Sequence, residues 1–163
     1  MVIVCLGLGS NLGNREELLE QGVQALQDRD GIEGVRFSAL YETEPVGPVE
    51  QGMFLNMALV CETTLSPREV LKTCKDIEIN VGGKKTDVRW GPRQLDIDIL
   101  LYGDEQLNEP PSLIIPHPEM LTRNFVLIPL AEIAPDIEIP GFGLTVSSAL
   151  KACGDTSGVK RIS

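Results

Sequence analysis

The 163-residue chain lacks the sequence features that mark zinc-binding, disulfide-rich, membrane and secreted proteins. It has one histidine and four cysteines, and the cysteines form no C-x-x-C pair, so neither a zinc finger nor a disulfide framework is indicated. Its apolar runs are shorter than the roughly 18 residues that a membrane helix needs. The first residues lack the basic start and the cleavage site of a signal peptide. We therefore expect a cytoplasmic protein with buried, reduced thiols and no membrane partner.

Basic residues are also scarce. The chain has 14 Lys and Arg against 24 Asp and Glu, and the net charge of −10 argues against general affinity for nucleic acid. The segment from Lys84 to Arg93 is an exception, because four of its residues are basic and one is acidic. Such an island in an acidic chain suits a small polyanion such as ATP, although a solvated loop is the commoner meaning of a short charge run.

The length and composition suit one domain over residues 1–163 with a proper hydrophobic core. Strands and helices mix without regular alternation, which predicts an α+β fold with helices packed on an antiparallel-dominated sheet. A compact apolar run predicts a strand over residues 2–8, and the alternation of apolar residues predicts strands over residues 35–41, 54–63 and 95–102. Apolar stripes and capping residues predict helices over residues 15–27, 66–82 and 145–152, and a helix over 125–134 that Pro129 kinks or breaks. The last residues of the chain are expected to be loose.

The termini of two helices carry capping signals. Asn14 can cap the helix that starts at Arg15. Ser66, with Pro67 after it and Glu69 three positions on, predicts a capping box. Residues 7–14 are rich in Gly and Asn but end in no G-K-[ST], so we expect a simple turn there rather than a phosphate loop.

The most informative stretch is R-W-G-P-R-Q-L-D-I-D-I-L-L-Y, residues 89–102. Its second half predicts a strand in which Asp96 and Asp98 share one face, because successive strand side chains alternate. Their α-carbons are then roughly 6.5 Å apart, so both carboxylates can reach one ion. Two carboxylates this close, on a strand rich in Ile and Leu, repel each other unless a positive partner meets them.

Two kinds of positive partner are available. Arg89 and Arg93 precede the strand in a loop that a Gly-Pro pair stiffens, and their planar forks suit phosphate. Mg²⁺ is the other, since oxygen-only ligands favour it over zinc or copper. The alternative is a solvated face on which Asp96 and Asp98 form ordinary ion pairs with the arginines. The arginines and the stiff loop favour a metal–phosphate site.

This stretch resembles the signature of the 6-hydroxymethyl-7,8-dihydropterin pyrophosphokinase family of folate biosynthesis. G-S-N-x-G from Gly9 and P-H-x-x-M-x-x-R-x-F from Pro116 extend the resemblance over nearly the whole chain. It implies a ferredoxin-like βαββαβ core with added strands. It also implies transfer of a pyrophosphoryl group from ATP to the hydroxymethyl oxygen of the reduced pterin, which releases AMP. ATP and the reduced pterin are then the expected partners, and we expect a monomer.

The resemblance also implies roles for individual residues. Asp96 and Asp98 would hold two Mg²⁺ ions, one on the α- and β-phosphates and one on the β- and γ-phosphates, and would form the catalytic set with Arg93. The residues implied at ATP are Lys75, Glu78, Lys85, Arg89, Arg93, Ile99, Ile114, His117 and Arg123, with Ile99 and Ile114 acting through their backbone. The residues implied at the pterin are Thr43, Glu44, Val46, Phe54, Asn56, Trp90, Asp96 and Phe125, with Phe54 and Phe125 on the two faces of the ring.

Several of these residues have plainer alternatives. Asn56 could satisfy a nearby loop, Glu78 could be a solvated helix charge, and a lone histidine such as His117 is more often structural than catalytic. The chain also departs from the family pattern, because Gly83 and Lys85 stand where relatives usually carry arginine. A lysine supplies charge but not the bidentate fork, so the phosphate contacts of this loop stay open.

Two other functions are compatible with the aspartates. A D-x-D motif also occurs in metal-dependent nucleotide-sugar transferases, against which Phe54, Asn56 and Phe125 argue. A non-catalytic nucleotide-binding domain is the second alternative, and the retention of Arg89 and His117 argues against it.

Overall fold

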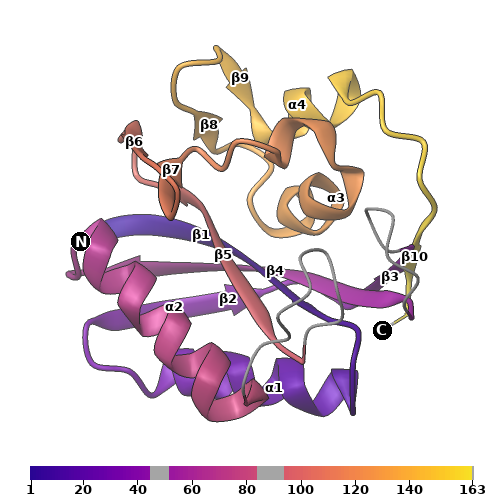
Figure 1. Ribbon diagram of the computed structural model, residues 1–163. Helices are drawn as coiled ribbons and strands as arrows, with labels where there is room; N and C mark the ends of the chain where they lie inside the picture. Colours follow the sequence, from indigo (N-terminus) through magenta and orange to yellow (C-terminus); the bar gives the residue numbers. More distant parts are fainter. Residues whose placement is uncertain (45–51, 84–93, 163) are drawn as a thin grey trace.

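The computed structural model describes residues 1–44, 52–83 and 94–162 (Figure 1). At its centre these residues form a six-stranded sheet with the strand order β10-β3-β4-β1-β5, and β2 also pairs with β4. Its strands are β1 (Val2–Ser10), β2 (Ile32–Phe37), β3 (Tyr41–Thr43), β4 (Phe54–Thr63), β5 (Asp96–Tyr102) and β10 (Val159–Arg161).

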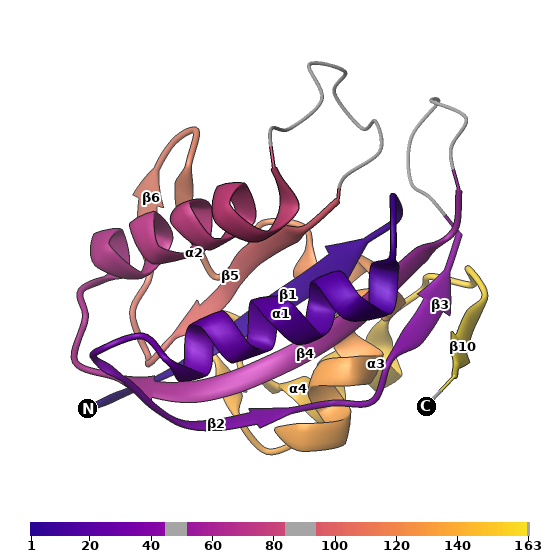
Figure 2. The same cartoon turned by 90° about the horizontal axis from the view of Figure 1, so that it is seen from below.

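The chain order builds a ferredoxin-like βαββαβ core, as the resemblance implies. β1 leads to α1 (Arg15–Gln27), the strands β2, β3 and β4 follow, and α2 (Pro67–Gly82) leads to β5. Every neighbouring pair in the sheet is antiparallel. Both helices cover one face of the sheet (Figure 2), and their apolar stripes pack there against alternate residues of β1, β4 and β5.

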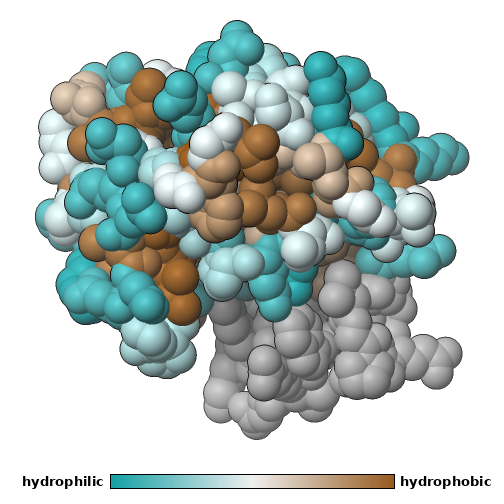
Figure 3. Space-filling model, turned by 90° about the horizontal axis from the view of Figure 1, so that it is seen from above, coloured by the Kyte–Doolittle hydropathy of each residue, from teal (hydrophilic) through white to brown (hydrophobic). Residues whose placement is uncertain are grey.

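The opposite face carries a second layer. It contains a short 3₁₀ turn (Met120–Thr122), α3 (Asn124–Ile133), α4 (Val146–Ala152) and the hairpin of β8 (Glu138–Ile139) and β9 (Leu144–Thr145). Another hairpin, of β6 (Leu107–Glu109) and β7 (Leu113–Ile115), follows β5. Leu127 and Leu130 of α3 pack on Ala58 and Val60 of β4. The outer surface of this layer mixes apolar residues near its middle with polar residues around them (Figure 3).

Local capping sets the ends of the first two helices as the sequence predicts. The Asn14 side chain accepts a hydrogen bond from the Glu17 amide at the start of α1. Ser66 and Glu69 form the complete capping box at the start of α2, with Pro67 in the first helical position. α2 ends at Gly82, and Gly83 follows with a φ of 76°, a conformation that favours glycine.

Three expectations about secondary structure were wrong. Residues 7–10 belong to β1 rather than to a turn. The strand expected over residues 35–41 is divided into β2 and β3, because the Ser38 hydroxyl accepts the Ala58 amide and the pairing with β4 shifts by one residue. The terminal residues expected to be loose form β10, which pairs with β3.

The helix expected to kink or break at Pro129 is not broken. α3 runs from Asn124 to Ile133 with Pro129 inside it. The proline removes one helical hydrogen bond, and the burial of Leu127 and Leu130 against β4 outweighs that loss.

Cys5, Cys61 and Cys74 are free and buried, as expected, whereas Cys153 is free but only partly buried. Burial raises the pKa of the Cys5 and Cys74 thiols to about 12 and that of Cys61 to about 11. Thiols of this kind are unreactive at neutral pH. Within the described parts of the chain, no helix is both long enough and apolar enough to span a membrane.

Candidate functional site

A row of cross-strand partners brings together residues that are far apart in the sequence. Asp96 of β5 lies opposite Gly9 of β1, Gly9 lies opposite Asn56 of β4, and Asn56 lies opposite Tyr41 of β3. The Tyr41 hydroxyl donates a 2.5 Å hydrogen bond to Glu132 of α3. The row therefore lies on the α3 side of the sheet, and it places Asp96 and Asn56 on either side of a single glycine.

The glycines of β1 are site residues that the sequence analysis missed. Gly7 lies opposite Asp98 as Gly9 lies opposite Asp96, so no side chain of β1 stands beside either carboxylate. A Cβ atom on Gly9 would lie 2.9 Å from the Asn56 Oδ1 atom, closer than real Cβ contacts come. The sequence could have indicated this role, because Gly7 and Gly9 stand two residues apart, as residues on one face of a strand do, inside an apolar segment.

The two aspartates place a pair of carboxylates on one face of β5. Both are partly exposed, whereas Ile97 and Ile99 beside them are buried, as the alternation predicts. Among the described residues no group of three or more His, Cys, Asp or Glu side chains could hold a metal. A pair of carboxylates suits Mg²⁺, which takes one or two carboxylates and fills its shell with water and phosphate oxygens. It does not suit a structural zinc site.

Glu78 fixes the strand between these aspartates. The side chain of Glu78 is 1% exposed, so the alternative of a solvated helix charge is wrong. Its Oε2 atom accepts a 2.7 Å hydrogen bond from the Ile97 amide, and its Oε1 atom lies 3.5 Å from the Nζ atom of Lys75. Because Ile97 stands between Asp96 and Asp98, this bond joins α2 to the strand that carries both carboxylates.

His117 is held beside the same strand. Its backbone amide donates to the Leu100 carbonyl of β5 at 2.9 Å, and its Nδ1 atom accepts the Glu119 amide at 3.1 Å. The proton of the neutral ring is therefore on Nε2, where it can be donated to an oxygen. Burial, with the nearby charge of Arg123, lowers the pKa of His117 below its ordinary value, and the charges of Glu119 and Asp96 oppose this shift.

Arg123 and Phe125 lie at the start of α3. The Arg123 guanidinium forms an ion pair with Glu119 and lies 5.5 Å from the centre of the Phe125 ring. No local side chain caps this helix, but Asp155 does so from the C-terminal segment: its Oδ2 atom accepts the Asn124 amide at 3.0 Å. The tail thus stabilises the turn on which both residues stand.

The expected pterin residues gather where β3 and β4 meet. Thr43 lies opposite Phe54, and the Asn56 amide donates to the Thr43 hydroxyl at 2.6 Å. Thr43 is buried, Phe54 and Asn56 are partly exposed, and Glu44 is exposed just beyond β3. Asn56 thus has a partner within the site, and its Oδ1 atom lies over Gly9.

Some of the other expected residues lie in described elements, and the rest cannot be placed. Lys75 is exposed on α2, and Ile114 is partly exposed in β7. The Ile97 amide points to the outer edge of β5, where it donates to Glu78. Backbone groups of an antiparallel strand point to its two edges in turn, so those of Ile99, two residues on, point to the same outer edge. The expected contributions of Val46, Lys85, Arg89, Trp90 and Arg93 lie outside the described residues.

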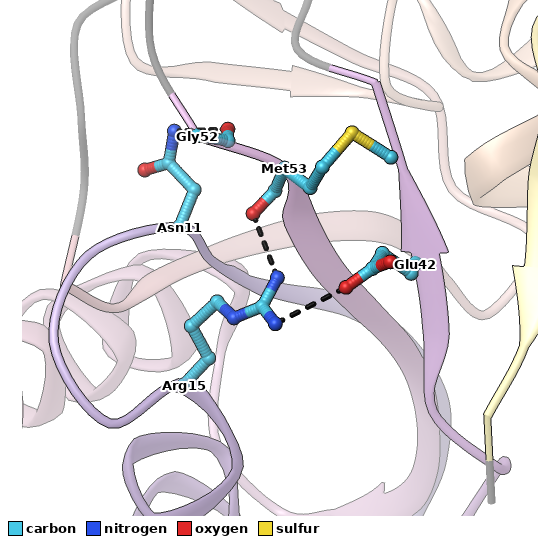
Figure 4. Close-up of polar contacts among 5 residues, drawn as sticks. All are labelled: Asn11, Arg15, Glu42, Gly52 and Met53. Atoms are coloured by element: carbon cyan, nitrogen blue, oxygen red, sulfur yellow. Dashed lines mark hydrogen bonds and ion pairs between the residues drawn. The ribbon is translucent and has the colours of Figure 1, made fainter.

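The N-terminus of α1 contacts the same strand ends (Figure 4). Arg15 donates to the Met53 carbonyl at 2.9 Å and to the Glu42 carboxylate at 3.1 Å, and Asn11 donates to the Gly52 carbonyl at 3.3 Å. These contacts had no counterpart in the sequence analysis, because they depend on the pairing of β3 with β4.

Comparisons with known proteins agree with the resemblance. The profile of a family described as 7,8-dihydro-6-hydroxymethylpterin-pyrophosphokinase (HPPK) matches residues 5–135. The chain is 46% identical over 136 residues to the 2-amino-4-hydroxy-6-hydroxymethyldihydropteridine pyrophosphokinase of Bacillus subtilis, covering 83% of this chain and 80% of that protein. It is 43% identical over 157 residues to the Methylorubrum extorquens protein of the same name, covering 96% of each.

Solved structures share the fold. A crystal structure described as HPPK-DHPS in complex with substrates superposes with a TM-score of 0.72 at 14% sequence identity. The match covers 93% of this chain but only 43% of that one, so this chain corresponds to less than half of the larger protein. At this identity the likeness supports the fold alone.

Proposed function

The chain belongs to the 7,8-dihydro-6-hydroxymethylpterin-pyrophosphokinase family, and we propose how its residues carry out that family's reaction. The protein is an ATP-dependent diphosphotransferase of folate biosynthesis. It transfers pyrophosphate from ATP to 6-hydroxymethyl-7,8-dihydropterin and yields AMP and the pterin diphosphate. The observation that carries the assignment of the site is the row from Asp96 through Gly9 to Asn56.

The pterin binds on the Asn56 side of this row. Asn56 offers donors and an acceptor to the ring edge, and its bond to Thr43 fixes the orientation of its amide. Phe54 and Phe125 supply flat apolar faces for stacking, one from β4 and one from α3. Glu44 and Val46, with Trp90 from the other loop, complete the expected set. This arrangement brings the hydroxymethyl group toward Gly9 and the aspartates.

ATP binds on the β5 side. His117 donates from Nε2 and Arg123 supplies a guanidinium to the phosphates, joined by Lys75, Lys85, Arg89 and Arg93. The backbone of Ile99 and Ile114 lies near adenine. Glu78 acts here through the β5 backbone, because its carboxylate binds the Ile97 amide.

Asp96 and Asp98 hold Mg²⁺, for which their oxygen-only ligand set is suited. The proposed number of ions is two, and when bound they neutralise the charge that grows on the departing AMP. The residues of the chain orient the pterin hydroxyl for attack on the β-phosphorus and place positive groups at the phosphate oxygens. We further propose that the protein acts as a monomer, as a single domain over residues 1–163, and in the cytoplasm.

The identity of the nucleotide product tests this function. The purified protein is incubated with ATP, Mg²⁺ and 6-hydroxymethyl-7,8-dihydropterin, and the products are separated by chromatography. Pterin-dependent AMP without ADP is the expected result. ADP would mean ordinary phosphoryl transfer, and ATP binding without any product would favour a non-catalytic nucleotide-binding domain.

A further inference from the structure

Arg15, the first residue of α1, binds β3 and the residue that leads into β4, the two strands that carry proposed pterin residues (Figure 4). Its Nη2 atom donates to the Glu42 carboxylate of β3 at 3.1 Å. Its Nη1 atom donates to the Met53 carbonyl at 2.9 Å, directly before β4 begins. The next residues along the chain, Thr43 and Phe54, are cross-strand partners. One guanidinium therefore binds the residue that precedes each member of this pair.

A second contact from the same segment reaches the start of β4. Asn11, just after β1, donates from Nδ2 to the Gly52 carbonyl at 3.3 Å. Arg15 and Asn11 thus bind two consecutive carbonyls of the chain that enters β4. Asn11 is also only two residues from Gly9, which lies opposite Asn56.

The chemistry of the contact requires arginine. A planar guanidinium can donate to two acceptors in fixed directions at once, whereas an ammonium group on a flexible stem cannot hold both in one geometry. The Arg15 and Glu42 side chains are each 30% exposed, so solvent screens the pair only in part. The Asn14 cap fixes the first turn of α1, from which Arg15 extends.

We propose that Arg15 is a positioning residue for the pterin. It holds β3 against the start of β4, so that Thr43, Phe54 and Asn56 keep the geometry that the ring requires. The inference rests on the proposed function, because it assigns the pterin to these strands. Arg15 itself does not touch the substrate. Its loss affects the pterin more than ATP, because its contacts lie on β3 and at the residue before β4. The described residues proposed at ATP lie on α2, β5 and β7 and near the start of α3.

The test compares steady-state AMP formation by the wild type and by Arg15→Ala, Arg15→Lys and Glu42→Gln, with each substrate varied in turn. Arg68→Ala is the matched control for the pterin, because the 2.8 Å ion pair of Arg68 with Glu109 joins α2 to β6 and does not involve β3 or β4. Arg15→Ala is expected to raise the KM for the pterin about tenfold and to leave the KM for ATP within about twofold. Arg15→Lys gives an intermediate rise, and Glu42→Gln, which keeps an acceptor oxygen, gives a small one.

The results separate this inference from a general loss of structure. Thermal unfolding is measured for each variant, and Arg15→Lys keeps the test valid if Arg15→Ala does not fold. A pterin KM that stays at the control value in both Arg15 variants would overturn the inference, as would equal rises in both KM values. A wild type that makes no pterin-dependent AMP would instead refute the proposed function, and the inference would be refuted with it.

Discussion

Gly9 has no side chain, and the proposed site depends on this. The Asn56 Oδ1 atom occupies the space where a Cβ atom would stand, at 2.9 Å, so Gly9→Ala must displace the Asn56 amide. We expect about a tenfold loss in kcat/KM, mainly through the pterin. Steady-state kinetics measure it, with Gly154→Ala as the control because a Cβ atom there would meet nothing within 4 Å. Equal kinetics for the two variants would contradict the role given to Gly9.

His117 supplies a prediction about pH. Burial lowers its pKa in the folded protein, so the unfolded chain binds a proton on this residue more readily than the folded one. The contribution of His117 to stability is therefore present above its unfolded pKa, about 6.5, and is lost as the pH falls through the lower folded value. His117→Gln should weaken the fall in stability between about pH 7.5 and about pH 5.5. Urea unfolding of both proteins at the two pH values measures this, and parallel falls would contradict the shift.

Among single residues, the sequence predicted those whose placement depends on local geometry. Asp96 and Asp98 share a face because a strand has a period of two, and Ser66 and Glu69 cap α2 because they stand three residues apart. The role of Gly9 could not be predicted in this way, since it depends on the register of β1 against β4.

Among the elements, α3 is capped by a residue far along the chain. The Asp155 carboxylate accepts the amide of Asn124, the first residue of α3, and the Asn124 side chain donates to the carbonyls of Asp155 and Ser157. Asp155→Ala should cost about 1 kcal/mol of stability, as the loss of an N-terminal cap does. It should lower the melting temperature by about 2–4 °C.

Calorimetry on Asp155→Ala and Asp155→Asn tests this cap. Asparagine keeps an acceptor oxygen and should restore most of the stability, since it is itself a good cap. A melting temperature of Asp155→Ala equal to that of the wild type would show that the cap contributes nothing.

The elements differ in how far they can be predicted. α1 and α2 start where their caps predict, because the signals lie within four residues. The division between β2 and β3 and the pairing of β10 with β3 could not be predicted, because each depends on a strand distant in the chain. The continuity of α3 through Pro129 depends likewise on packing against β4.

At the scale of the whole molecule, the sheet brings two halves of a site together. β3 and β4 present the proposed pterin residues, β5 presents the carboxylates, and β1 joins them with its glycines. The family signature identified the aspartates and the pterin residues in the sequence. That they lie in one row across the sheet could be seen only from the strand order and register. We propose that pyrophosphate is transferred over this row of residues.

The most direct test is AMP formation by Asp96→Asn and Asp98→Asn, with Asp104→Asn as the control and circular dichroism as the check on folding. Asparagine keeps the size of the side chain but removes the charge that binds Mg²⁺. We expect each site variant to lose about a hundredfold or more in kcat while it remains folded, and the control to stay near the wild type. Site variants that fold and turn over at the rate of the control would contradict the account.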